Sequence, residues 1–309
     1  MLLVANGSVF TRNAQTPFIP NGAVTIDGDT IVEVGPECEL KAKYPDAEYV
    51  DAQGNLIMPG LINCRTHIYS GLARDLAIKG CNPTNFLENL EQQWWKIDNN
   101  LTLDGTKASA YATILDSIRD GVTTIFDHHA SFCEIPGSLF TIKDAAQELG
   151  MRSCLCYEVS DRRGQEKCDQ AIAENAEFAQ WAAKERRDND NHMIAAMPNV
   201  GWCEAMTMLF ENNAKMASKY FDRKLGVLEP GAAADVIVMD YKPFTPLSEE
   251  NIDGHMLFGM MGKNCRTTIT NGRVLYKDRE FVGIDEDKIN AWTMAESKKL
   301  WSTLNDRAY

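Results

Sequence analysis

The chain has 309 residues, of which 44% are hydrophobic and 24% charged, as is ordinary for a folded globular protein. Its 44 Asp and Glu residues outnumber its 31 Lys and Arg residues, which gives a net charge of −13. Nucleic acids and anionic membranes attract basic surfaces, so we expect neither a nucleic-acid partner nor a membrane partner.

The first part of the chain predicts β-structure. Strand-forming runs at residues 2–4 and 8–11 flank the turn dipeptide Asn6–Gly7. Residues 23–34 predict a hairpin whose turn is Asp27-Gly28-Asp29, because glycine tolerates the positive φ of tight hairpin turns. Two more short strands follow before residue 59.

From residue 57 onward, apolar strands alternate with helical segments. This rhythm is typical of parallel strands joined by crossover helices. The expected strands are 56–62 (which runs into Asn63), 122–126, 152–158 and 192–197, and the expected helices are 86–97, 106–119, 139–149 and 165–187.

The alternation stops after Met197. A helix at about residues 202–220 is followed by strand and turn composition, including a hairpin at 266–276, and then by a terminal helix. The β-rich ends therefore bracket a βα centre. The predicted domains are a composite β-sandwich from 1–56 and 225–285, a partial (β/α) barrel from 57–224, and a C-terminal helix, 286–309.

Nine cysteines are scattered along the chain at spacings that do not suggest a disulfide scaffold. We interpret them as free, mostly buried thiols. No basic segment followed by an apolar stretch opens the sequence, and no stretch approaches the length of a membrane span. We therefore expect a cytoplasmic protein.

Polar residues cluster where the first two strands of the βα centre end. The first strand leads into Asn63-Cys64-Arg65-Thr66-His67, and the second ends at Asp127-His128-His129. Side chains alternate along a strand, so Arg65 and His67 share a face. For the same reason, at most Asp127 and His129 of the second cluster converge.

Three segments together resemble the amidohydrolase superfamily. MPGLINCRTHIYSGLARD is similar to its first-strand motif, which normally carries a His-x-His pair. GVTTIFDHHAS and LGVLEPGAAADVIVMD are similar to its second strand and its return strand. Segments 58–75, 121–139, 157–164 and 244–259 together resemble the aminohydrolases called SsnA, near the chlorohydrolase and nucleobase-deaminase branch.

The resemblance implies an α/β fold, with a (β/α)8 barrel and a small β-sandwich built from both chain ends. It also implies a metal-dependent hydrolase in which one or two divalent cations, zinc or iron, activate water. That water attacks a non-peptide C–N or C–Cl bond of a small substrate, such as a heterocyclic amine. The implied ligands are the paired histidines of strand one, one histidine each from strands five and six, and an aspartate from strand eight. We also expect a homo-oligomer.

The sequence departs from the family pattern in two ways. Arg65 stands where the first histidine of the pair belongs, and a guanidinium has no lone pair to donate to a metal. Beyond Met197, the motifs of strands five, six and eight are missing. A complete barrel needs roughly 250 residues, so we expect an incomplete one that lacks more than about a hundred residues between 197 and 198.

The candidate site follows from these departures. His67 is the predicted metal ligand, although one imidazole cannot make a site of normal ligand count. Arg65, Asp127 and His129 are predicted substrate contacts, with Arg65 pairing to a substrate carboxylate. No residue is assigned a catalytic role.

The sequence leaves three hypotheses for function. The first is a metal-dependent aminohydrolase that deaminates a small substrate, with turnover impaired in this chain. The alternative is a catalytically inactive, truncated pseudoenzyme that serves as a binding or oligomerisation partner. A third is that the gap arose when the coding sequence was assembled, so that the natural protein is longer.

Overall fold

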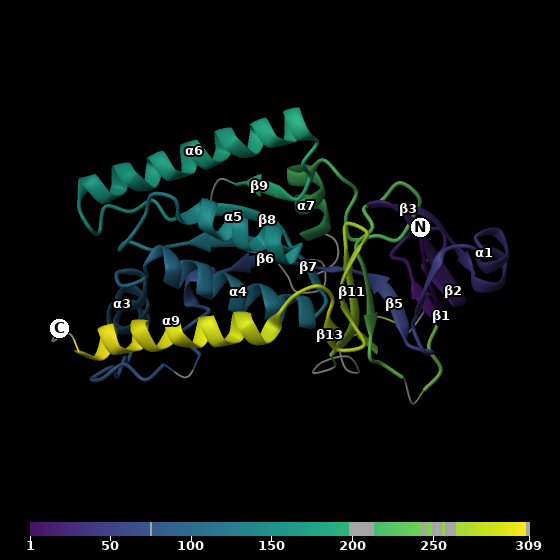
Figure 1. The fold of residues 1–309 in the computed structure, drawn as a ribbon, viewed down its shortest axis with the longest axis horizontal. Coiled ribbons are helices and arrows are strands. Elements are labelled where there is room, and N and C mark those ends of the chain that lie inside the picture. The colour runs from purple at the N-terminus through teal and green to yellow at the C-terminus, as the bar shows by residue number, and fades with distance from the viewer. Residues whose placement is uncertain are drawn as a thin grey trace. The chain divides into compact units, whose positions relative to one another are not determined.

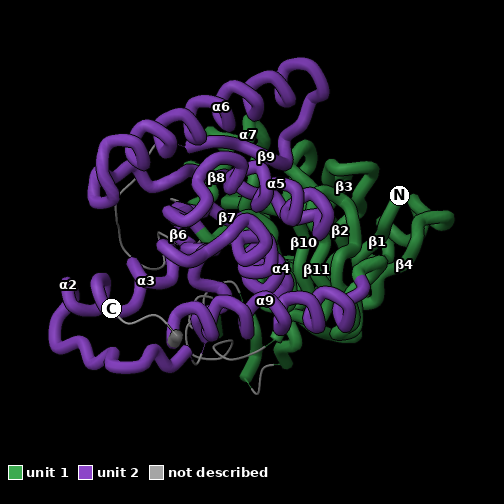
Figure 2. Tube along the Cα trace, turned by 60° about the vertical axis from the view of Figure 1, so that its left-hand side comes forward, with its two compact units in different colours: residues 1–63, 117–124, 203–284 green, residues 64–116, 125–202, 285–309 purple. Residues whose placement is uncertain are grey.

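The computed structural model describes residues 1–74, 76–197, 213–242, 245–248, 252, 255–256 and 264–306. Its strands form two sheets, and helices accompany them, so the predicted α/β class is confirmed (Figure 1). The chain divides into two compact units (Figure 2). Unit 1 comprises residues 1–63, 117–124 and 203–284, and unit 2 comprises residues 64–116, 125–202 and 285–309.

The larger sheet joins strands from both ends of the sequence. Its order is β13-β12-β11-β10-β5-β1-β2-β3, with β4 pairing in parallel to β1. β10 runs antiparallel to β5, with Val238 opposite Ile57. The predicted two-layer sandwich and domain boundaries stay predictions. The strands are β1 (Leu2–Phe10), β2 (Phe18–Asp27), β3 (Thr30–Pro36), β4 (Glu48–Asp51), β5 (Leu56–Pro59), β10 (Val236–Met239), β11 (Cys265–Thr270), β12 (Arg273–Lys277) and β13 (Glu280–Phe281).

The β1 strand corrects one sequence prediction. The runs on either side of Asn6–Gly7 form a single strand, because the dipeptide makes a bulge rather than a turn. Asn6 has a φ of 60°, and the register with β2 shifts between Val4 and Gly7. A Cβ on Gly7 would lie 2.3 Å from the Asn55 carbonyl oxygen, so the close approach of that backbone requires glycine.

Alternating apolar side chains supply the core of this sheet. Burying apolar surface contributes roughly 25 cal/mol per Å², which makes this cluster a main source of stability for unit 1. The buried side chains include Val4, Val9, Val24, Ile26, Ile31, Val50, Ile57, Val236, Val238 and Ile269.

The smaller sheet carries the βα centre. Its order is β6-β7-β8-β9, and β8 runs parallel to β9. Helices α5 and α6 pack against β8. The strands are β6 (Leu61–Thr66), β7 (Val122–His129), β8 (Arg152–Tyr157) and β9 (Ile194–Ala196), and the helices between them include α4 (Leu103–Arg119), α5 (Ser138–Leu149) and α6 (Gln165–Asn189).

Four strands in the described part of this sheet are half of the eight in a complete barrel. The expected gap falls next to residues 198–212, which lie outside the described residues. Incompleteness of the barrel therefore stays a prediction. The start of the predicted helix at 202–220 and most of segment 244–259 also lie outside the described residues.

The remaining helices include one that differs from its prediction. Residues 86–97 were expected to form one amphipathic helix, but α2 and α3 are separated by a π-helical turn, η2, which rotates the apolar face. Phe86 is consequently 75% exposed, whereas Ile97 is buried. These elements are α1 (Glu37–Lys43), which was not predicted, η1 (Ile68–Ser70), α2 (Phe86–Asn89), η2 (Leu90–Trp94), α3 (Trp95–Asp98), α7 (Asn213–Phe221) and α9 (Glu286–Asp306).

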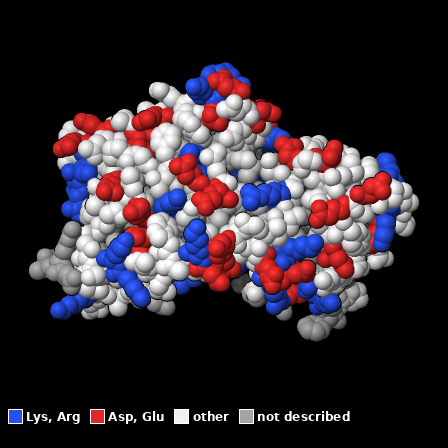
Figure 3. Space-filling view, in the orientation of Figure 1, with Lys and Arg blue, Asp and Glu red and all other residues white. Residues whose placement is uncertain are grey.

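The cysteines within the described residues are free thiols, as the sequence suggested, but only Cys154, Cys156 and Cys265 are buried, so the prediction of mostly buried thiols is wrong. Burial raises the pKa of Cys156 to about 12, which makes its thiolate scarce. None of the described helices is both long enough and apolar enough to span a membrane. On the face shown in Figure 3, acidic and basic side chains are interspersed.

Glu174 links α6 to the start of α5. Its carboxylate is 3% exposed and accepts hydrogen bonds from the backbone N–H groups of Gly137 (2.7 Å) and Leu139 (2.8 Å). Glu174→Ala should therefore lower the free energy of unfolding by about 1–3 kcal/mol, because a buried and a part-buried backbone donor lose their acceptor. Urea denaturation measures the change. Glu177→Ala, at an exposed position of the same helix, is the control and should change stability little.

Candidate functional site

The tip of β6 is held by two hydrogen bonds to one imidazole. His67 follows the last residue of β6 and precedes η1. Its Nδ1 lies 2.9 Å from the carbonyl oxygen of His128, and its Nε2 lies 2.9 Å from Nη2 of Arg65. A carbonyl oxygen can only accept and a guanidinium can only donate. Nδ1 therefore carries the proton, and Nε2 accepts from Arg65.

Asp127 is completely buried on β7. Its Oδ1 accepts a hydrogen bond from the backbone N–H of Ile68 at 2.6 Å, and this bond fixes the chain just after His67. Among the described residues, its Oδ2 has no hydrogen-bond partner. Burial raises the pKa of Asp127 to about 8, while the bond from Ile68 opposes the shift. The carboxyl group is thus mostly protonated at neutral pH.

His129 lies in an aromatic environment on the same strand. Its ring centroid is 5.6 Å from that of Tyr157 and 6.3 Å from that of Tyr69. Neither ring nitrogen has a hydrogen-bond partner within the described part of the chain. Burial lowers the pKa of His129 to about 3, so the ring is neutral at physiological pH.

His128 corrects the prediction that at most Asp127 and His129 converge on the site. The His128 ring centroid lies 5.7 Å from that of His67, edge to face. The alternation rule failed because His67 has left the strand: with φ −128° and ψ 82° it opens η1, and its ring turns toward the neighbouring strand. Burial lowers the pKa of both His67 and His128.

The buried His129 predicts a loss of stability in acid. Its pKa is about 3 in the folded protein and about 6.5 when unfolded, so the unfolded state binds more protons as pH falls through this window. Between pH 7 and pH 5, His129 should therefore contribute about 2 kcal/mol of destabilisation. His129→Phe should remove this part of the pH dependence, measured by urea denaturation at both pH values. Tyr157→Phe, which alters a neighbouring ring without removing the imidazole, should keep it.

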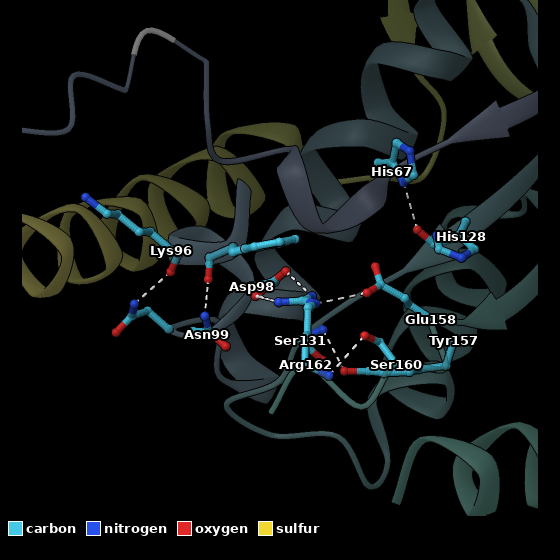
Figure 4. A network of polar contacts seen from close by, with 12 residues as sticks. His67, Lys96, Asp98, Asn99, His128, Ser131, Tyr157, Glu158, Ser160 and Arg162 are labelled. Atoms are coloured by element: carbon cyan, nitrogen blue, oxygen red, sulfur yellow. Dashed lines mark hydrogen bonds and ion pairs between the residues drawn. The ribbon is translucent and has the colours of Figure 1, made fainter. Parts of the chain in front are cut away.

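An ion-pair network that sequence reasoning missed lies in the same unit (Figure 4). Arg162 donates from Nη2 to Asp98 Oδ2 (2.6 Å) and from Nε to Glu158 Oε1 (3.1 Å). The Arg162 guanidinium carbon lies 4.0 Å from the centroid of the Phe132 ring and 5.2 Å from that of Trp95. Burial raises the pKa of Asp98 to about 7, and Arg162 opposes the shift.

Glu158 connects this network to the histidines. Figure 4 shows Glu158 between Arg162 on one side and His67 and His128 on the other, and its charge acts on both imidazoles. The signal in the sequence was the four-residue spacing of Glu158 and Arg162 directly after a strand, within segment 157–164. The family resemblance of that segment implies no role for either residue.

The described residues do not fit a metal ion. No three His, Cys, Asp or Glu side chains among them are grouped so that they could hold one ion. The free lone pair of His67 already accepts from Arg65, and a permanent positive charge beside it would repel a cation. We therefore assign no catalytic step to a metal at these residues.

Comparison with known proteins identifies the family. A sequence model of the amidohydrolase family matches residues 56–220, more than half of the chain. The chain belongs to the amidohydrolase family. This confirms the resemblance that the strand motifs predicted.

Relatives of this chain include named deaminases. It is 29% identical over 188 residues to a 5′-deoxyadenosine deaminase of Methanococcoides burtonii, covering 59% of this chain and 39% of that protein. It is 28% identical over 161 residues to a 5-methylthioadenosine/S-adenosylhomocysteine deaminase of Desulforudis audaxviator, covering 51% and 34%. The matched region thus spans only about two fifths or less of these relatives.

Solved structures show the fold. An atrazine chlorohydrolase from Arthrobacter aurescens complexed with zinc is similar with a TM-score of 0.66 and 17% identity, covering 96% of this chain and 100% of that chain. An adenosine deaminase from Xanthomonas campestris with bound zinc gives 0.71 and 14%, covering 97% and 98%. These likenesses support a (β/α)8-type hydrolase fold.

The structure brings the predicted site residues into one region of unit 2. Arg65 and His67 touch directly, and Asp127 bonds to the residue after His67. His129 lies in the neighbouring aromatic cluster, where Tyr69 is a shared neighbour of His67 and His129. Their roles as metal ligand and substrate contacts stay predictions.

Proposed function

We propose that this chain is an aminohydrolase-type protein, of the kind called SsnA, that binds a small heterocyclic amine. The reaction of this type is hydrolytic deamination, the cleavage of a non-peptide C–N bond. We propose that this reaction is impaired here and that the barrel is incomplete. A cytoplasmic location, a homo-oligomeric state and an ancestral need for zinc or iron belong to the same proposal.

Family membership and the deaminase names of the relatives support the substrate class. The single observation that carries impairment is the hydrogen bond from Arg65 to His67 Nε2. A deaminase of this type needs a water molecule whose pKa is lowered by a cation, and catalytic metal sites use about three protein ligands. The described residues offer no such group.

The proposed substrate wall is formed by Arg65, Asp127 and His129. The Arg65 side chain is exposed to solvent, so a carboxylate of the ligand could reach its guanidinium. Asp127 is mostly protonated at neutral pH, so it would donate a hydrogen bond to a ring nitrogen that reached it. His129 is neutral and, like Asp127, fully buried, so of the three residues only Arg65 is exposed and a ligand would have to open the site to reach the other two.

A second candidate function is a non-catalytic binding or oligomerisation partner. Ammonia distinguishes the two candidates, because hydrolytic deamination releases it and binding alone does not. The same Arg65–His67 hydrogen bond favours binding over turnover, because it occupies the lone pair that a metal would need.

The test uses adenosine-type ligands taken from the relatives' names. 5′-Deoxyadenosine, 5-methylthioadenosine and S-adenosylhomocysteine would each be added to the purified chain, and the melting temperature and ammonia release recorded. We expect at least one ligand to stabilise the fold, by about 2.7 kcal/mol at one hundred times its Kd. We expect no ammonia above the buffer rate, with or without added zinc or iron.

Other results of this test would favour an active enzyme or an oligomerisation partner instead. Metal-dependent ammonia release would contradict impairment. Failure of every heterocyclic amine to bind would contradict the substrate class and leave the oligomerisation partner. Asp127→Asn should weaken ligand binding, whereas Asp116→Asn, in an exposed ion pair with Arg74, should not.

A further inference from the structure

We propose that the Arg65 guanidinium is a built-in replacement for a metal ion at His67, so that this chain keeps divalent cations off the tip of β6 with its own side chain. The inference does not depend on which ligand the protein binds. It rests on the same Arg65–His67 hydrogen bond as the impairment in the proposed function, but its test follows zinc at His67, whereas the test of the proposed function follows ligand binding and ammonia release.

The first step is the orientation of the imidazole. The carbonyl oxygen of His128 accepts from Nδ1 at 2.9 Å, and this bond fixes which nitrogen carries the proton. Nε2 is then the nitrogen with a free lone pair, the one available for coordination. In metal-binding histidines, a hydrogen bond from the other ring nitrogen to a carbonyl or carboxylate oxygen fixes the tautomer and the ring orientation in the same way. His67 is thus oriented like a ligand.

The second step is what meets that lone pair. Nη2 of Arg65 lies 2.9 Å from Nε2, at hydrogen-bonding distance. A guanidinium stays protonated under all conditions that a folded protein meets, so it cannot leave the position by losing its charge. A metal would have to displace a charged donor and then sit beside a unit positive charge.

The third step is the shortage of compensating ligands. Glu158 is the acidic residue whose charge acts on both His67 and His128, but it already accepts from Arg162. Asp127 uses Oδ1 to hold the backbone of Ile68, and although its Oδ2 has no partner, no three His, Cys, Asp or Glu side chains among the described residues are grouped so that they could hold one ion. Replacing Arg65 should therefore expose His67 to metal without creating a site of full ligand count.

The experiment follows the histidine ring nitrogens by NMR during titration with zinc chloride. In the wild type, the His67 signals should show the Nδ1–H tautomer and should not move on addition of zinc. In Arg65→Leu, His67 should respond at a zinc concentration at least about tenfold lower than any wild-type response. Arg65→Gln keeps a neutral donor and separates the effect of the occupied lone pair from that of the charge.

The same NMR spectra supply the control and show the outcomes that would contradict the proposal. His192, which contacts Asp190, provides an internal reference whose response to zinc should be the same in both proteins. A wild-type His67 that shifts with zinc, or that shows the Nε2–H tautomer, would overturn the proposal. An Arg65→Leu protein with unresponsive His67 would overturn it too. Because Arg65 is exposed, both variants should keep the wild-type melting transition, which is checked first.

Discussion

Replacing Asp98 by alanine is expected to lower the free energy of unfolding by about 3–5 kcal/mol, because it strands the charge of Arg162. Asp98 is 1% exposed, and the Arg162 side chain is 13% exposed. The guanidinium would keep only the bond to Glu158 and its contacts with Phe132 and Trp95. Urea denaturation at pH 7.5 measures the change.

Two further variants define this effect. Asp116→Ala removes the carboxylate of an exposed pair, whose Arg74 side chain is 78% exposed, and should cost less than about 1 kcal/mol. Adding Arg162→Met to Asp98→Ala should recover part of the loss, since no buried charge is then left unpaired. An Asp98→Ala protein as stable as the wild type would show that the network contributes little.

Replacing Gly272 by alanine should lower the free energy of unfolding by about 3 kcal/mol or more. Gly272 has a φ of 77° in the turn between β11 and β12. A left-handed conformation costs a residue with a Cβ roughly 1–2 kcal/mol, and overpacking adds about 1–3 kcal/mol. The new Cβ would lie 1.7 Å from the carbonyl oxygen of Gly28. Thermal and urea denaturation report the loss.

Gly28 itself is the matched control. It has a φ of 57° in the turn between β2 and β3, but an added Cβ would meet no atom within 4 Å. Gly28→Ala should therefore cost only the conformational term, about 1–2 kcal/mol. Equal losses in the two variants would contradict the close approach of these two turns. Gly28 and Gly272 are about 240 residues apart in the sequence.

Local signals in the sequence were enough to predict most elements of the fold. Gly121 and Gly150, with φ values of 76° and 77°, follow α4 and α5 near the predicted ends. The turn glycines of the two predicted hairpins, Gly28 and Gly272, also have positive φ values. The exceptions depended on tertiary contacts: the Asn6–Gly7 bulge is shaped by the backbone of Asn55, and the π turn before Trp95 has no signature in hydrophobic spacing.

The candidate site could be predicted less completely. The predicted neighbours Arg65 and His67 are in contact, but alternation did not place His128 beside His67, because His67 lies just beyond the end of β6, where the rule no longer applies. The ion pair of Asp98 and Arg162 joins residues 64 positions apart, and no local pattern specifies such a contact. The two-residue spacing of Arg65 and His67 also does not predict that the guanidinium donates to the lone pair of the imidazole.

The metal content of the wild-type chain is the most direct test of this account. The protein would be loaded with excess zinc, separated from free metal by gel filtration, and measured by inductively coupled plasma mass spectrometry. We predict far less than one zinc per chain, because Arg65 covers His67 and the described residues supply no complete ligand set. A content of about one zinc per chain that is lost in His67→Asn would contradict the account.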